Sequence, residues 1–118
     1  MPTANNTRRV TGLQVLKQYD SNSYQINGGA AIAGGTNLAD AAAFSETITA
    51  VGIAATDTKI GIAARDAIVI PQGLALISAV ASATNTVTVT WRNTTQQVIS
   101  PPAAGVWSVA VLGNFLTN

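Results

Sequence analysis

The stretch TNTVTVTWRN, residues 84–93, constrains the fold of this chain more than any other segment. Threonine and valine alternate along it, and a tryptophan continues the valine positions. Alternation with a period of two, in β-branched and aromatic residues, is typical of a strand with one buried face. We therefore expect a strand here, with Val87, Val89 and Trp91 in the core and the threonines facing outward.

Other apolar stretches also have strand patterns. They are FSETITAVGI, TKIGIAA, AIVI, LALISAVAS and VWSVAVLGNFL. Turns are predicted at ATD, residues 55–57, and at PQG, where Pro71 and Gly73 interrupt the pattern. No long helical pattern separates the strands, so a parallel α/β sheet is not expected. About six short strands at this spacing predict an all-β fold, an antiparallel β-sandwich over residues 41–118.

The alternation also predicts which side chains face the core. In FSETITAVGI, Phe44 and Ile48 are predicted on one face of the strand and the threonines on the opposite face. In LALISAVAS the pattern predicts one face with Leu74, Leu76, Ser78 and Val80, opposite Ala75, Ile77, Ala79 and Ala81. The expected core residues are Ile48, Ile60, Ile70, Leu76, Val87, Val89, Trp91, Val109 and Val111.

Residues 1–40 differ from the rest of the chain. They begin with a polar stretch and contain glycine pairs at 28–29 and 34–35, which are poor material for helices and strands. We expect an extended, glycine-rich N-terminal arm that fits closely against another backbone. A disordered tail is the alternative, although the apolar side chains of the segment argue against it. The expected interface residues are Arg8, Arg9, Leu13, Leu16, Tyr19, Tyr24, Trp107 and Phe115.

Charge is scarce in this chain of 118 residues. Charged residues make up 9% of it, with a net charge of +1, against about 25% in an average globular domain. One interpretation is an ordinary globular domain whose surface is polar but uncharged. The other is a subunit whose surface is covered by partners, because charge is depleted at interface cores. Nothing predicts a nucleic-acid partner, a membrane span or an export signal, so we expect synthesis in a cytoplasm.

The sequence contains few of the residue types that catalysis commonly uses. Histidine and cysteine are both absent, which removes the commonest general base and all thiolate chemistry. The carboxylates form no local cluster; they are Asp20, Asp40, Glu46, Asp57 and Asp66. The glycine pairs lack the lysine and hydroxyl residue of a phosphate loop. We expect no enzyme activity, no cofactor, no metal and no small-molecule substrate.

The C-terminal two-thirds resembles small structural proteins of bacteriophage virions. Their pattern is PxGL, then DTVTVxxxNxT, then a proline and an xWxVxV strand. The residues here that match it are Pro71, Gly73, Leu74, Thr86, Val87, Thr88, Val89, Asn93, Pro101, Trp107, Val109 and Val111. The resemblance covers about residues 44 to 113, and no family signature is found in the first 40 residues.

The resemblance implies a β-sandwich, in some members jelly-roll-like, that assembles as a trimer. It implies a head decoration (cement) protein that binds the major capsid protein on the outside of a phage head and stabilises it. The expected location is the virion, assembled in the host cytoplasm. The alternative is a tail or spike component whose tryptophans, Trp91 and Trp107, line a receptor- or glycan-binding face. A small domain with weak enzyme activity is a third hypothesis, disfavoured by the missing histidine and cysteine.

Overall fold

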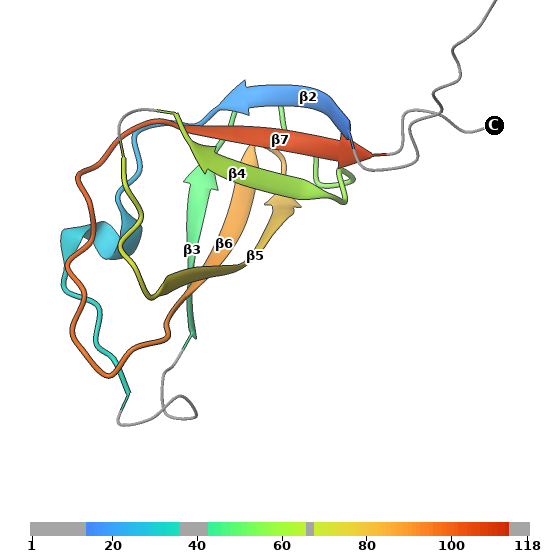
Figure 1. Ribbon diagram of the computed structural model, residues 1–118. Coiled ribbons are helices and arrows are strands. Elements are labelled where there is room, and N and C mark those ends of the chain that lie inside the picture. Colours follow the sequence, from blue (N-terminus) through green and yellow to red (C-terminus); the bar gives the residue numbers. More distant parts are fainter. Residues whose placement is uncertain (1–13, 36–42, 66–67, 114–118) are drawn as a thin grey trace, which may run out of the picture.

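The computed structural model describes residues 14–35, 43–65 and 68–113. Their strands are β2 (Gln14–Asp20), β3 (Ala43–Thr49), β4 (Ile60–Ala64), β5 (Leu74–Ala83), β6 (Thr86–Asn93) and β7 (Trp107–Gly113), and a 3₁₀ turn, η1, spans Ile26–Gly29. Two antiparallel three-stranded sheets, in the orders β2-β7-β4 and β3-β6-β5, pack together (Figure 1). The predicted all-β sandwich is confirmed.

The central strands, β6 and β7, carry the core. Burial alternates along both, and on β6 the side chains of Val87, Val89 and Trp91 are fully buried. The expected inward face of TNTVTVTWRN is therefore confirmed. Of the expected core residues, Ile48, Val109 and Val111 are also buried, whereas Ile60 is half-buried because β4 lies at a sheet edge.

Both predicted turns are present. The Leu74 N–H donates to the carbonyl of Pro71, and Gly73 has a φ of +91°. This is a turn in which glycine takes the left-handed position that other residues avoid. At residues 54–57 the Asp57 carboxylate accepts from the Ala54 N–H at 3.0 Å. The short polar side chain of aspartate thereby closes the turn on its own backbone.

The facing predicted for β5 is wrong in its second half. The register with β6 skips Ile77, which is the extra residue of a β-bulge. Because a bulge adds one residue to one strand, every later side chain changes face. Ala79 therefore lies inward, and Val80 lies outward opposite Thr88. Val80 is 48% exposed.

Two expected core residues are instead exposed. Ile70 is 39% exposed, because it lies in the connection before the Pro71 turn and outside any strand. Leu76 is 38% exposed although it pairs with Trp91, because β5 is an edge strand and nothing described covers its open side. Alternation predicts the face of a strand, but not whether that strand lies at the edge of its sheet.

The expected arm over residues 1–40 is not an arm where the structure describes it. β2 pairs with β7 along its length, and Ile26 and Ile32 are buried in the core. The apolar residues of this segment complete the sandwich of their own chain. A Cβ on Gly34 would stand 2.4 Å from the Thr95 carbonyl oxygen, so the close backbone approach is within the chain. Residues 1–13 and 36–40 of the expected arm lie outside the described residues.

Candidate functional site

A polar network joins the segment after β2 to the other sheet. The Trp91 Nε1–H donates to the Tyr24 hydroxyl at 2.9 Å, and that hydroxyl donates to the Glu46 carboxylate. The same Glu46 oxygen accepts the Asn27 N–H at 3.0 Å. Asn27 has a φ of +57°, a left-handed conformation that asparagine tolerates better than most residues. The network satisfies the polar atoms that this packing would otherwise leave without partners.

Burial raises the pKa of the Tyr24 hydroxyl well above its usual value, and the hydrogen bond to Glu46 adds to the effect. Because the folded state holds this proton more tightly than the unfolded state, its contribution to stability is present below about pH 10, the usual tyrosine pKa, and is lost as the pH rises above it.

We expect wild-type protein to lose more unfolding free energy than Tyr24→Phe between about pH 9 and pH 11. Denaturant titrations at each pH measure the unfolding free energy of both proteins. An equal loss of unfolding free energy in wild type and Tyr24→Phe would contradict the prediction.

The aromatic side chains form one cluster between the sheets. The Trp91 and Trp107 rings meet edge to face with centroids 5.9 Å apart, and the Tyr24 and Trp107 centroids lie 6.0 Å apart. Such edge-to-face pairs favour a fixed packing. Trp107 is 1% exposed and Trp91 is fully buried. Trp107 was expected at an interface and belongs to the core instead, since it lies on the inward face of the central strand β7. Neither ring is available to stack on a sugar.

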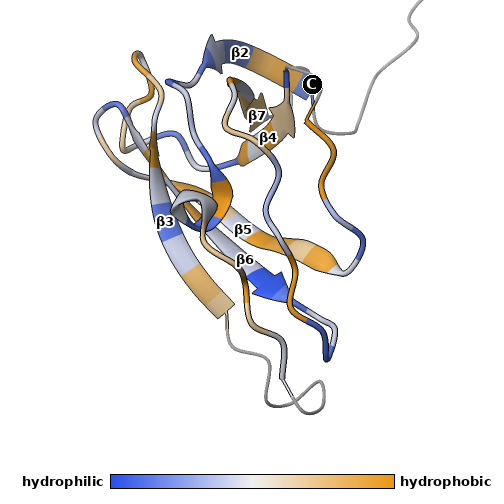
Figure 2. Ribbon diagram, turned by 90° about the vertical axis from the view of Figure 1, so that its left-hand side faces the viewer, coloured by the Kyte–Doolittle hydropathy of each residue, from blue (hydrophilic) through white to orange (hydrophobic). Residues whose placement is uncertain are grey.

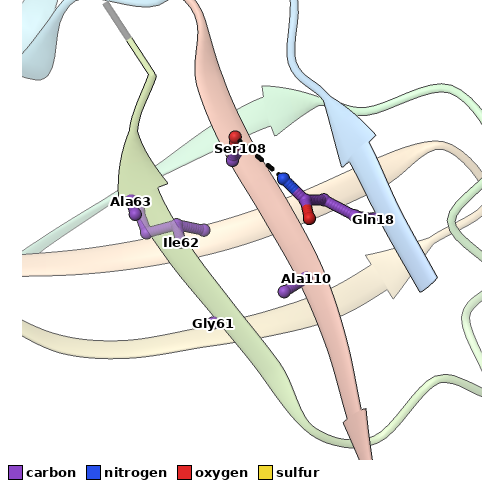
Figure 3. Close-up of a pocket in the computed structure, with 6 residues that line it drawn as sticks. All are labelled: Gln18, Gly61, Ile62, Ala63, Ser108 and Ala110. Carbon is purple, nitrogen blue, oxygen red and sulfur yellow. Dashed lines mark hydrogen bonds between the residues drawn. The ribbon is translucent and has the colours of Figure 1, made fainter. Parts of the chain in front are cut away.

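A shallow pocket of about 280 Å³ lies on the outer face of the sheet β2-β7-β4 (Figure 3). Its lining residues are Gln18, Gly61, Ile62, Ala63, Ser108 and Ala110. Gly61 pairs with Ala110, so two of the smallest residues lie opposite each other at the centre of this face. The Gln18 amide donates to the Ser108 hydroxyl at 3.3 Å. The pocket exists because Gly61 and Ala110 are too small to fill this part of the sheet surface.

Beside the pocket, an ion pair joins the end of β2 to the residue that follows β4. Arg65 Nη1 lies 2.8 Å from Asp20 Oδ2, and Asp20 is the neighbour of Ser108 in the register of β2 with β7. Both side chains are more than half exposed, and such pairs contribute about 0–1 kcal/mol. The expectation that the charges of residues 65–66 form a turn or edge feature agrees with the position of Arg65 directly after β4; Asp66 lies outside the described residues.

Each of the described acidic side chains makes a contact within the fold. Asp20 pairs with Arg65, Glu46 accepts from Tyr24, and Asp57 closes its turn. No group of three or more potential metal-ligating residues occurs in the part of the chain that the structure describes. The residues that line the pocket include no titratable side chain. The pocket therefore offers shape and two polar groups, without an acid, base or nucleophile of adjusted pKa.

Other expected interface residues lie on or near β2. Leu16 is 44% exposed, beside an irregularity in the register of β2. Tyr19 is half-buried, and a Cβ on Gly52 would stand 2.4 Å from its ring. Tyr24 is half-buried in the core network. The remaining expected interface residues lie outside the described residues; they are Arg8, Arg9, Leu13 and Phe115.

The largest exposed apolar side chains of β5 were not expected at an interface. Ile77 and Val80 are 54% and 48% exposed, and Leu76 joins them on the same strand. Figure 2 shows apolar residues along this strand. The absence of any charged residue from Ile68 to Trp91 is the sequence signal that points to this surface. Strand alternation predicts Leu76 in the core and gives no sign that the strand lies at the edge of its sheet.

No protein-family model, no curated protein and no solved structure matches this chain. Among the described residues, no helix has the length and hydrophobicity that a membrane crossing requires.

Proposed function

We propose that this protein is a structural virion protein that decorates a phage head. It binds the major capsid protein on the outer surface of the shell as a trimer and stabilises the shell. The observation that carries the proposal is the exposed apolar strand β5 on a domain with few charges. Surfaces of this kind on small domains mark contacts with other proteins.

The fold supports a structural role. Both tryptophans are used for packing, and the described carboxylates are used for turns, an ion pair and the core network. A sandwich with two uncharged edge strands, β4 and β5, is suited to bury that side against neighbours, because charge at the centre of an interface is costly to desolvate. Clamping adjacent coat subunits in this way would oppose the outward pressure of packaged DNA.

The alternative of a tail or spike component with a glycan-binding face depended on exposed tryptophans. Both rings are buried, so this alternative has lost the feature that favoured glycan recognition. A tail protein that binds only other virion proteins would use the same apolar surface. The experiment must therefore distinguish binding to the phage head from binding to the tail.

The experiment mixes the purified protein with phage heads from which accessory proteins have been removed, and separates bound from free protein by sedimentation. We expect saturable binding with a fixed number of copies per head, and heads that resist heat or low ionic strength better than bare heads. Heads that bind no protein would contradict the proposal. Binding to tails but not to heads would replace it with the tail alternative.

A further inference from the structure

The two open sides of the sandwich differ in chemistry. On one side β4 and β5 lie next to each other, and each is the edge strand of its sheet (Figure 1). We call this surface, Ile60–Ala64 with Leu74–Ala83, the β4–β5 side. Its sequences, IGIAA and LALISAVASA, contain no charged residue. No described strand pairs with the outer edge of either.

The opposite side, between β2 and β3, carries charges and covering segments, although Val15 and Leu16 of β2 are 56% and 44% exposed. β2 carries Lys17 and Asp20, which are charges on an edge strand. Next to β3, the Asn22 N–H donates to the Thr49 carbonyl at 2.9 Å, and the Asn27 N–H donates to the Glu46 carboxylate. Charges and covering segments are the devices by which proteins keep edge strands from associating. This chain uses them on one side and not on the other.

The hydrophobic core also opens toward the β4–β5 side. Apart from the buried Leu74 at the start of β5, the inward residues of β4 and β5 are half-buried or exposed, whereas those of the central strands are buried. On β5 the bulge places Val80 outward and leaves Leu76 at the open edge. In the connection between the strands, Val69 is 79% exposed. Apolar side chains on two strands and their connection therefore meet water on this side, which is unfavourable in a monomer.

We propose that the β4–β5 side is the contact between copies of this chain, and that a second copy covers it. A partner recognised by charge would need opposite charges here, and both strands have none. The same surface on the neighbouring copies is equally uncharged and apolar, so the copies of a trimer that meet around its three-fold axis bury this side without leaving an ion unpaired. The bulge at Ile77 interrupts the edge, so side-chain burial drives the contact. The inference rests on the proposed function only for its setting, an oligomer on a shell.

The test uses the full chain with one lysine introduced at a time. Val80→Lys and Ser78→Lys place a charge on the outer face of β5, next to the open edge of the β4–β5 side, and Ser78→Lys removes no apolar side chain. Val98→Lys is the matched control, because Val98 is 66% exposed in a loop outside β4 and β5. Molar mass is measured by light scattering over about a hundredfold range of concentration. Circular dichroism and denaturant unfolding establish that each variant is folded.

We expect wild type and Val98→Lys to have the same mass, a multiple of the 12.0 kDa chain. Both β5 variants should be monomers, or dissociate at concentrations about tenfold higher or more. A monomeric wild type would overturn the inference, and so would β5 variants that keep the wild-type mass. Head binding by the same proteins separates the two proposals. An oligomer broken by Val80→Lys that ignores heads contradicts only the proposed function. A wild-type monomer that binds heads, and loses that binding in Val80→Lys, assigns the β4–β5 side to the coat protein; it contradicts the inference and the trimer of the proposed function, and leaves head binding in place.

Discussion

Trp91→Ala is expected to lower the free energy of unfolding by about 3–5 kcal/mol, the range for removing a large aromatic side chain from a core. The Trp91 ring is fully buried, packs edge to face on Trp107 and donates its N–H to the Tyr24 hydroxyl. Alanine leaves a cavity between the sheets and removes one hydrogen bond from the network that holds residues 24–27. Equilibrium unfolding in urea, followed by tryptophan fluorescence from Trp107, measures the change.

Val98→Ala is the control for this experiment, because Val98 is exposed and surface substitutions change stability by about 0.5 kcal/mol or less. A loss below about 1 kcal/mol for Trp91→Ala would contradict the placement of this ring in the core. It would also restore the hypothesis that Trp91 lies on a binding face.

Asn93→Ala is expected to cost about 2–4 kcal/mol, although it removes no apolar surface. The Asn93 side chain is 1% exposed at the end of β6. Its amide donates to the carbonyls of Ile32 and Gln97 at 3.1 and 2.8 Å, and its oxygen accepts the Thr95 N–H at 2.9 Å and the Thr95 hydroxyl at 2.7 Å. Alanine leaves several of these buried groups without partners, and each such group costs about 1–3 kcal/mol.

Gln97→Ala is the matched control, because Gln97 contributes backbone atoms to the same turn while its side chain is exposed. We expect its unfolding free energy to stay within about 0.5 kcal/mol of wild type. Comparable losses for both variants would show that the turn itself is sensitive to substitution, and that the Asn93 amide is not what stabilises it.

The central strands could be predicted from sequence because their environment is symmetrical. β6 has a neighbour on each side, so its alternation of threonine with Val87, Val89 and Trp91 translates directly into outward and inward faces. The same holds for β7 with Val109 and Val111. A pattern of period two contains this information in full.

The edges could not be predicted in this way. The bulge at Ile77 depends on the register between β5 and β6, which no local pattern in LALISAVASA contains. The exposure of Leu76 depends on β5 being last in its sheet, which is a property of the topology. The edge position explains why Leu76 is exposed and not in the core, and the bulge explains why Ala79 and Val80 lie on the faces opposite to those predicted.

The glycine-rich segment shows a second limit. Glycine pairs do predict close approach to another backbone, and Gly34 makes one. The sequence does not say whether that backbone belongs to the same chain. Here it is the turn at Thr95, which Asn93 also holds, and Ile32 exchanges backbone hydrogen bonds with Ile99 beside it. These long-range contacts convert the expected arm, over residues 14–35, into part of the sandwich.

The central claim, that this domain is a head decoration protein, is tested most directly by titrating stripped phage heads with the purified protein and counting the bound copies. We expect saturation at a fixed number of copies per head, in multiples of three for the proposed trimer, together with greater resistance of the heads to heat. Heads that remain bare at every protein concentration would contradict it.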